Sequence, residues 1–247
     1  MTAPVPGLSV VLPALNEAAG IERTLDALAD AADRLTGVVG EVEVVVVDDG
    51  STDATAELVA ARARRDPRVH LVRHARNRGL GAAVRTGLGA ARGRVVCYTD
   101  ADLPFDLAEL DAMVAQVLGG EVAVVSAYRS DRGGEGLRRW VYSYAYNLLV
   151  RSALGLRVRD VNFAGKVLRR EALDAVTLRS EGSFIDAELL AKVDRLGFAI
   201  AQVEVRYFPR SRGVSTLSSL GVVAGILQEM RAIRPEIIAL GRGGPRP

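Results

Sequence analysis

The chain has 247 residues, of which 49% are hydrophobic and 25% charged, a balance typical of a folded globular protein rather than a disordered one. Its formal charge of +2 provides no global basic field for binding nucleic acid. A single cysteine, Cys97, excludes an internal disulfide framework and favours a reducing, cytoplasmic location. The first residues lack the basic segment of a signal peptide, and no stretch is long and apolar enough to predict a transmembrane helix.

Apolar runs alternate with helical patterns through the first half of the chain. We expect a strand from Leu8, a helix capped by Asn16, and a second strand, "VEVVVV", that ends in two acids. A helix through Arg64 follows, and a short strand begins at Val69. The first helix should bury the residues that recur at three- and four-residue spacing, which are Ile21, Leu25, Leu28 and Ala32.

The pattern continues with a helix rich in small residues and a fourth strand. The stretch "NRGLGAAVRTGLGAARG" predicts a helix that packs closely on a sheet, and "RVVCYTDADL" predicts the next strand. Asp106 and Glu109 have the spacing of a capping box for the helix after it. Such alternation predicts an α/β fold with a mostly parallel sheet, whose ligands bind beyond the carboxyl ends of the strands.

Two carboxylates end the fourth strand. Asp100 and Asp102 are two residues apart and should project to one face, whereas Ala101 points away. Close carboxylates repel each other unless a cation lies between them, and Mg²⁺ or Mn²⁺ commonly binds one or two carboxylates with waters and phosphate oxygens. For an isolated pair, solvated acids that cap the next helix are the alternative.

Two other strand ends also carry polar residues. Asp48 and Asp49 are followed by "GSTD", 50–53, which could bind a nucleobase or ribose, or could supply the cap of the next helix. The stretch "RNRGLG", 76–81, places two cations and two glycines before a helix N-terminus, which favours a bound anion. Together the three strand ends predict a site for a nucleotide diphosphate and its metal.

Several stretches occur in the order and spacing of one enzyme family. "PALNEA", "VVVVDDGSTDAT", "NRGLGAAVRTG" and "YTDADL" resemble the motifs of family 2 glycosyltransferases with the GT-A fold. "VRDVNFAGKVLRREAL", "FIDAELL" and "VEVRYFPRSRGVSTL" look like the branch that includes dolichol-phosphate mannose synthases and bacterial polyprenyl-phosphate relatives. The resemblance covers about residues 8–220. It implies a GT-A catalytic domain over 1–220, followed by an amphipathic helix and flexible tail over 221–247.

The resemblance also implies a role for each matching position. The metal, Mg²⁺ or Mn²⁺, would bind Asp100 and Asp102. The reaction centre would contain two acids and three arginines: Asp160, Glu188, Arg129, Arg139 and Arg210. The nucleotide sugar would be bound by Pro13, Asn16, Glu17, Asp48, Asp49, Asn77, Gly81, Asp100, Ala101, Asp102 and Lys166.

Three departures from the family pattern concern the sugar and the acceptor. Pro104 stands where dolichol-phosphate mannose synthases have a glutamine, and it offers no side-chain ligand. Lys166 replaces the arginine of the family's Gly-Phe-Arg, and Thr216 replaces a lysine. These changes keep the expected donor fold but leave the sugar and the acceptor open.

Two segments of the second half could serve a lipid acceptor. From Arg129 to Arg170 there are ten Lys or Arg and three acids, which could bind phosphate-bearing substrates or form a solvated surface. The aromatic stretch 140–149 could guide a prenyl chain, although core packing suits most of its side chains. One face of the last helix is apolar and could lie on a bilayer, pack against the domain or form a dimer. Its residues are Val223, Ile226, Leu227 and Met230.

The sequence therefore predicts a metal-dependent, inverting glycosyltransferase. It would move a hexose from a nucleotide-diphosphate sugar of the GDP-mannose or UDP-glucose type to a polyprenyl or dolichyl phosphate. The protein would be cytoplasmic, could contact the inner face of the plasma membrane through its last helix, and would bind no nucleic acid. A polyprenyl phosphate hardly needs a general base, whereas a hydroxyl acceptor would need one, with Asp160 the first candidate.

Other functions stay open at this point. The acceptor could instead be the hydroxyl of a soluble small molecule or glycan. The chain could also be a sugar nucleotidyltransferase, although it lacks that group's N-terminal glycine-rich signature, or a noncatalytic nucleotide-sugar binder. A Rossmann dehydrogenase is poorly supported, because no G-x-G-x-x-G follows the first strand.

Overall fold

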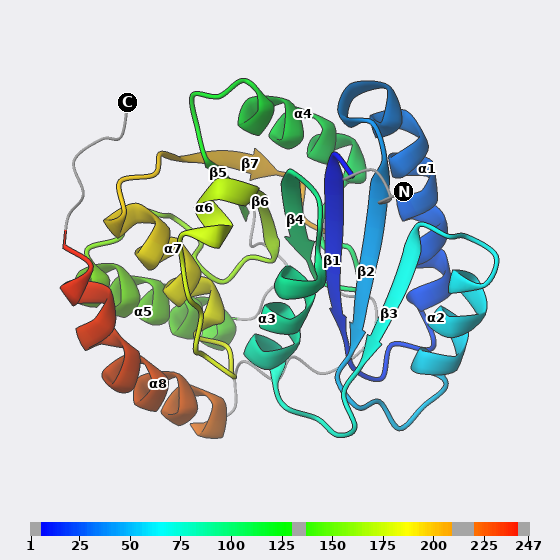
Figure 1. The fold of residues 1–247 in the computed structure, drawn as a ribbon. Helices are drawn as coiled ribbons and strands as arrows, with labels where there is room; N and C mark the ends of the chain where they lie inside the picture. Colours follow the sequence, from blue (N-terminus) through cyan, green and yellow to red (C-terminus); the bar gives the residue numbers. More distant parts are fainter. Residues whose placement is uncertain (1–5, 130–136, 209–219, 242–247) are drawn as a thin grey trace.

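Seven strands form one mixed sheet between two layers of helices (Figure 1). The computed structural model describes residues 6–129, 137–208 and 220–241, with side chains described outside 137–145 and 220. The strands are β1 (Leu8–Ala14), β2 (Val42–Asp48), β3 (Val69–Arg73), β4 (Val95–Thr99), β5 (Val124–Arg129), β6 (Gly165–Arg169) and β7 (Ile200–Val205). The helices are α1 (Ile21–Val39), α2 (Thr55–Ala63), α3 (Leu80–Ala90), α4 (Leu107–Leu118), α5 (Leu137–Leu154), α6 (Arg170–Asp174), α7 (Ile185–Arg195) and α8 (Leu220–Ala239).

The strand order is β3-β2-β1-β4-β6-β5-β7. Strands β1 to β4 are parallel, and β7 is parallel to β5. Strand β6 runs antiparallel to both of its neighbours, β4 and β5. The predicted α/β fold with a mostly parallel sheet is confirmed, with β6 as a reversed strand within it.

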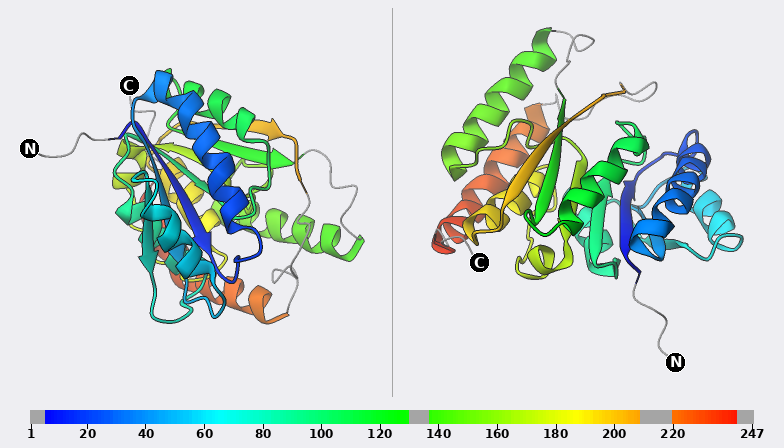
Figure 2. Two further views of the ribbon diagram at one scale, coloured as in Figure 1. Left: turned by 90° about the vertical axis from the view of Figure 1, so that its right-hand side faces the viewer. Right: turned by 90° about the horizontal axis from the view of Figure 1, so that it is seen from above.

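Each face of the sheet has its own hydrophobic core. Alternate residues of β1 serve opposite faces, so that Val10 and Leu12 belong to the core with α1, α2 and α4, and Val11 to the core with α3, α5, α7 and α8. The right-hand view of Figure 2 shows α5 and α8 at the end of the molecule opposite α1 and α2. The sheet is therefore covered on both sides, as its uninterrupted apolar strands require.

The apolar face predicted for the first helix is confirmed, but its start is not. Ile21 and the three residues spaced behind it are all at most 2% exposed. The N-cap of α1 is Gly20 rather than Asn16. Asn16 instead occupies a left-handed turn, with φ of +57°. An asparagine tolerates that conformation because its short amide can bond locally.

The other predicted caps are partly confirmed. The N-cap of α2 is Ala54 and not one of the predicted residues 51–53, although Asp53 accepts from the N–H of Thr55, the first residue of the helix, at 3.0 Å. Asp106 caps α4 by accepting from the N–H of Ala108 at 2.9 Å. Glu109 does not complete a capping box, because its Oε1 accepts from the N–H of Arg206 at 3.0 Å. That contact ties α4 to the segment after β7.

Helix α3 packs closely on the sheet, as its small residues predict. A Cβ added to Gly87 would lie 2.3 Å from Cγ1 of Val11 on β1. No side chain fits in that space, because interior atoms are already in van der Waals contact. Gly87 therefore sets the distance between α3 and the strands that carry the acids.

Helix α8 packs its apolar face against the domain. Ile226 and Met230, from the predicted face, are 5% and 8% exposed, and Ile233 and Ile237 continue the buried row. Leu227, by contrast, is 38% exposed and lies outside that contact. Among the described helices, none combines the length and apolarity needed to cross a bilayer. Of the alternatives for this face, packing against the domain is the one realised.

A buried carboxylate holds the amino-terminal edge of the sheet together. Glu43, at the start of β2, is 3% exposed. Its Oε1 accepts from the hydroxyl of Ser9 and the N–H of Arg92, both at 2.6 Å, and its Oε2 from the Arg92 guanidinium at 2.6 Å and 2.9 Å. Burial opposes ionisation, but these bonds from Ser9 and Arg92 outweigh it and lower the pKa of Glu43 below its ordinary value of 4.5.

We expect Glu43→Gln to lower the free energy of unfolding at pH 7 by about 2–3 kcal/mol, since charge-assisted hydrogen bonds are lost. Because the folded-state pKa is lowered, the wild-type carboxylate stabilises fully above pH 4.5 and loses its effect as the pH falls through the folded pKa. The difference between the two proteins should therefore shrink below pH 4.5. Urea denaturation from pH 3.5 to 7 measures it, and a difference independent of pH would contradict this account.

Candidate active site

The sheet topology brings the predicted functional residues to one edge. Strands β1 to β5 and β7 all run in one direction, so their carboxyl ends meet there, and the reversed strand β6 begins there. Asp48 ends β2, Asp100 follows β4, and Arg129 ends β5. Thr99 pairs with Gly165, so the segment that enters β6, including Asp160, reaches the same edge.

The loops after β1 and β2 are bonded to each other. Pro13 is buried in β1, and Asn16 and Glu17 follow it. The N–H of Asn16 donates to the Ser51 hydroxyl at 2.9 Å, and its side-chain oxygen accepts from the N–H of Thr52 at 2.9 Å. The N–H of Glu17 donates to the hydroxyl of Thr55 at 2.8 Å. The residues expected to contact the nucleotide thus lie on a loop pair that is fixed from both sides.

The two acids after β2 have different surroundings. Asp48 is fully buried, and its Oδ2 lies 3.3 Å from Nε of Arg73 on β3. Asp49 accepts from the N–H of Arg78 at 3.0 Å and of Gly79 at 2.9 Å. Nδ1 of the buried His74 donates to Asp49 at 2.6 Å, and Nε2 of that ring lies 2.9 Å from the Thr86 hydroxyl. Asp49 therefore fixes the turn before α3, and of the pair Asp48 is left as the candidate for binding the nucleoside.

The start of α3, expected to take an anion, bonds to other parts of the chain. The N–H of Gly79 donates to Asn77 Oδ1 as well as to Asp49, and the N–H of Ala82 donates to the carbonyl of Glu181. A Cβ on Gly81 would lie 2.6 Å from the carbonyl oxygen of Ser180. The lack of a side chain at Gly81 thus makes room for the loop at 180–182, which gives this glycine a packing role.

The metal-motif residues lie in a turn just after β4, and they differ in burial. Ala101 is 5% exposed and its carbonyl accepts from the Thr24 hydroxyl of α1 at 2.6 Å, whereas Asp100 and Asp102 are half-buried. Both carboxylate oxygens of Asp102 are buried. Leu103 follows with φ of +47°, and its N–H returns to the carbonyl of Asp100 at 3.1 Å. This tight turn holds the two acids close to the end of β4.

These residues fit a divalent cation of the Mg²⁺ or Mn²⁺ type. Among the described residues no cluster of three His, Cys, Asp or Glu side chains offers a closed metal site. Two neighbouring carboxylates with a buried component suit an ion that keeps waters and completes its shell with substrate phosphate oxygens. Asp100 and Asp102 are the residues that would hold it.

An ion pair between Arg129 and Asp160 stands at the same edge. Asp160 is 1% exposed and its Oδ2 accepts from Nε of Arg129 at 2.9 Å. The guanidinium lies 5.5 Å from the ring centre of Phe163 and 5.0 Å from that of Tyr207. In contact with both rings and bonded to a carboxylate, Arg129 is held in one orientation.

Lys166 lies in the interior next to this pair and not on a surface that a ligand could reach. Its side chain is 0% exposed, and its ammonium donates to the carbonyl of Phe163 at 2.8 Å and to Asp186 at 2.5 Å. Burial raises the pKa of Asp186, the ammonium opposes this shift, and the carboxylate of Asp160 adds to it. Lys166 therefore supports the segment 160–163 from within, a correction to the direct donor contact expected for it.

Glu188 also has a structural role. It is fully buried, accepts from the N–H groups of Arg179 and Ser180 at 2.7–3.0 Å, and lies 2.7 Å from the ammonium of Lys192. These bonds use both of its oxygens for the loop before α7. The other two arginines of the expected reaction centre, Arg139 and Arg210, lie outside the residues whose side chains are described.

Sequence analysis missed several residues that hold the site. Arg73, His74 and Tyr207 support residues named above, and Asp186 compensates the charge of Lys166. The sequence does give one indication of the role of Asp186. In "FIDAELL" it is a charged residue between apolar ones, on a helix that packs against the sheet. Its cation is 20 residues away in sequence, so no local pattern pairs the two.

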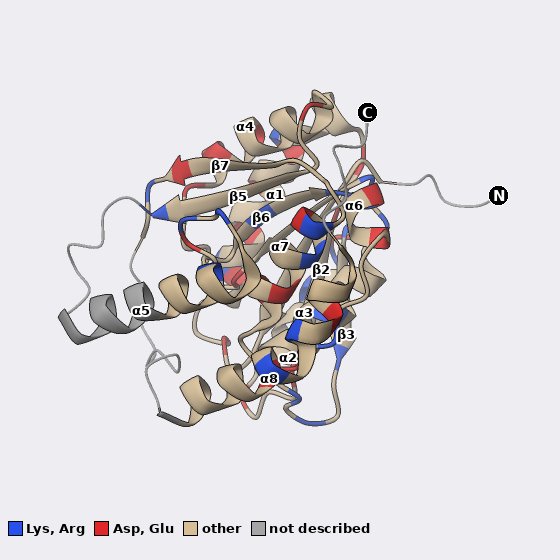
Figure 3. Cartoon of the chain, turned by 90° about the vertical axis from the view of Figure 1, so that its left-hand side faces the viewer, with Lys and Arg blue, Asp and Glu red and all other residues tan. Residues whose placement is uncertain are grey.

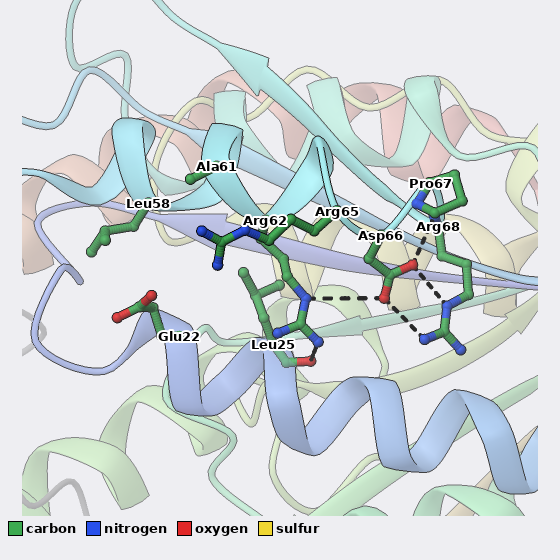
Figure 4. Close-up of a pocket in the computed structure, with 9 residues that line it drawn as sticks. All are labelled: Glu22, Leu25, Leu58, Ala61, Arg62, Arg65, Asp66, Pro67 and Arg68. Carbon is green, nitrogen blue, oxygen red and sulfur yellow. Dashed lines mark hydrogen bonds and ion pairs between the residues drawn. The ribbon is translucent and has the colours of Figure 1, made fainter.

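A surface pocket of about 500 Å³ lies elsewhere, between α1 and α2 (Figure 4). Two of its three arginines are held in ion pairs: Arg62 lies 2.5 Å from Asp26, and Arg68 contacts Asp66 and Asp33. None of the acids at the strand ends lines it. We therefore place the candidate active site at the sheet edge and not in this pocket.

Residues 9–177 match the model of glycosyl transferase family 2. This chain belongs to that family. It is 35% identical over 82% of its length to glycosyltransferase AglD of Haloferax volcanii, and 30% identical over 86% of its length to an undecaprenyl-phosphate mannosyltransferase of Micrococcus luteus. The chain spans 33% of the former protein but 88% of the latter. The predicted family is confirmed, and such relatives support its polyprenyl-phosphate branch.

Solved structures of the family share the fold. Glucosyl-3-phosphoglycerate synthase of Mycobacterium tuberculosis, in complex with Mn²⁺, UDP-glucose and phosphoglyceric acid, superimposes with a TM-score of 0.66 at 26% identity. The match covers 90% of this chain and 79% of that one. The GT-A architecture expected from the resemblance is confirmed.

The role of Lys166 can be tested by stability. We expect Lys166→Met to lower the free energy of unfolding by about 3–5 kcal/mol, because it leaves the carboxylate of Asp186 buried without a cation. The double variant Lys166→Met/Asp186→Leu should recover most of that loss. Urea denaturation measures both variants. A single variant as stable as the wild type would show that Lys166 does not support the core.

Proposed function

We propose that this chain transfers a hexose from a nucleotide-diphosphate sugar to a polyprenyl phosphate, with inversion at the sugar carbon. The observation that carries the proposal is the convergence of Asp48, the Asp100–Asp102 pair and the Arg129–Asp160 pair at one sheet edge in a family 2 chain. A relative named as a dodecaprenyl-phosphate galacturonate synthase, from Rhizobium johnstonii, supports the acceptor class. It is 30% identical over 84% of this chain, which spans 61% of it.

The donor is proposed to lie across the ends of β1, β2 and β4. Asp48 accepts hydrogen bonds from the nucleoside, and Arg73, 3.3 Å away, orients its carboxylate. The loop of Pro13, Asn16 and Glu17 covers the nucleoside from the side of β1. Asp100 and Asp102 would hold Mg²⁺ or Mn²⁺, whose charge would stabilise the diphosphate leaving group.

The acceptor is proposed to approach from the side of β5 and β6. Arg129 offers a fixed guanidinium for an acceptor phosphate, and Asp160 holds it in place. An acceptor phosphate is already an anion, so its oxygen attacks without a general base. Arg139 and Arg210 are proposed as further phosphate contacts.

A phosphate-bearing soluble acceptor is the second candidate. The neighbour with UDP-glucose bound holds phosphoglyceric acid, whose phosphate could use the same arginine. The two candidates differ in the apolar chain of the acceptor. Transfer of radiolabelled sugar to undecaprenyl phosphate in detergent, compared with transfer to 3-phosphoglycerate, distinguishes them.

A membrane-facing surface is proposed on α5 and α8, which lie side by side with Arg234 bonded to the carbonyl of Ala153. Its apolar members, Leu148, Leu149 and Leu227, are 53%, 41% and 38% exposed. The exposed cations beside them are Arg151, Arg231 and Arg234. The described parts of these helices show few charges along their outer sides in Figure 3. Exposed leucines among cations suit the headgroup region of an anionic bilayer.

The donor site is tested by calorimetric titration with UDP-glucose, UDP-N-acetylglucosamine and GDP-mannose, each with and without Mg²⁺ or Mn²⁺. We expect one donor to bind in a metal-dependent manner and Asp102→Asn to weaken it by about 10–100-fold, because half of the metal's carboxylate ligands lose their charge. The control is Asp106→Asn, which removes a nearby charge but keeps the cap of α4. Binding that is unaffected by metal or by Asp102→Asn would contradict the site.

The membrane surface is tested by flotation with vesicles that contain phosphatidylglycerol. We expect Leu227→Asp to reduce the bound fraction several-fold, because it adds a negative charge to an apolar, basic surface. Val38→Asp is the matched control, since Val38 is 65% exposed on α1, far from α5 and α8. Equal binding of both variants would remove the support for this surface.

A further inference from the structure

Four successive backbone N–H groups before α7 are held by two carboxylates from different helices. Glu188 of α7 accepts from Arg179 and Ser180. Glu229 of α8 accepts from the N–H groups of Glu181 and Gly182, both at 2.8 Å, and from the Ser180 hydroxyl at 2.9 Å. Consecutive amides that point one way form an anion-binding concavity, and here the chain fills it with its own acids.

The opposite side of this loop lies on the first turn of α3. The carbonyl of Glu181 accepts from the N–H of Ala82 at 3.2 Å. A Cβ on Gly79 would lie 2.4 Å from that same carbonyl oxygen, and one on Gly81 would lie 2.7 Å from the carbonyl oxygen of Gly182. The loop 180–182 thus fits between α8 and α3 with no space for a side chain on either glycine.

The first turn of α3 is in turn bonded to the end of β2. Gly79 donates to Asp49, the neighbour of Asp48, and Asn77 bonds to Gly79 within the same turn. A continuous set of hydrogen bonds therefore runs from Glu229 through the loop 180–182 and the start of α3 to the strand end that carries Asp48. Helices α3, α7 and α8 share one face of the sheet, where this set lies (Figure 1).

We infer that Glu229 is a positioning residue for the nucleotide-sugar donor, an inference that rests on the proposed function. Glu188 fixes the first half of the loop, but the half that touches α3 is held by Glu229. Without that carboxylate the loop and the first turn of α3 lose their fixed separation, and the Asp49-bonded turn beside Asp48 loses its support. The C-terminal helix, which lies beyond the residues matched by the family model, thereby takes part in donor binding.

The test is Glu229→Gln, which replaces the carboxylate by a neutral amide and so weakens the charge-assisted bonds from the loop's N–H groups. We expect faster hydrogen exchange in residues 79–84, measured by mass spectrometry on the intact chain. We also expect the dissociation constant for UDP-glucose or GDP-mannose, with Mn²⁺, to rise about tenfold. In turnover, the KM for the donor should rise while kcat changes by less than about twofold.

Glu236→Gln is the matched control on the same helix. Glu236 contacts the side chains of Lys192 and Arg179 and none of the loop's N–H groups. It should therefore leave both the exchange of 79–84 and the donor affinity unchanged. Thermal unfolding of both variants reports how far each loosens α8 in general.

The outcomes separate this inference from the proposed function. Wild-type protein that binds no donor refutes the proposed function, while the exchange measurement still decides whether Glu229 supports α3. Donor binding that is equal in wild type and Glu229→Gln, or weakened equally by both variants, overturns the inference. If Glu229→Gln does not fold, Ser180→Ala, which removes one of the three bonds, is judged by the same measurements.

Discussion

The antiparallel pairing of β6 with β4 determines the whole arrangement of the site. Thr99 lies opposite Gly165 and Tyr98 opposite Lys166, and the Thr99 hydroxyl bonds to the carbonyl of Ala164 at 3.0 Å. A parallel strand at this position would start at the far edge of the sheet. Because β6 is reversed, the segment with Asp160 enters it beside Asp100, and Arg129 on the next strand reaches Asp160. The pairing therefore joins the half that is proposed to bind the nucleotide, β1 to β4, to a half that offers a fixed cation.

Most polar groups at the edge of the sheet that carries the candidate site form hydrogen bonds with one another and not with solvent. Asn16 bonds to the loop after β2, and Asp49 to the turn before α3. Buried acids such as Glu188 and Asp186 each have a cation within 2.7 Å. Their removal would leave charges or amides without partners, which is costly inside a protein. Such bonds position the few groups that would meet a substrate, so binding need not order them.

Local patterns in the sequence were sufficient to predict the fold class and part of the site. The apolar runs identified the strands that end in acids, and three- and four-residue spacing identified the buried face of α1. Both follow from the geometry of one element. Lys166 and Gly81 could not be read this way, because their environments are made by segments distant in the chain. The sequence around a lysine does not show whether its ammonium binds a phosphate or pairs with a buried aspartate.

The same limit applies to α8, and it bears on how this helix works. Its sequence has one evident apolar face, which the domain buries through Ile226 and Met230. Leu227 and Glu229 are two residues apart, which on an α-helix separates them by about 200° around the axis. The side proposed to meet a bilayer is therefore opposite the side that holds the loop 180–182. A bilayer could contact α8 from outside without disturbing Glu229, so membrane attachment and donor binding can occur at once on one helix.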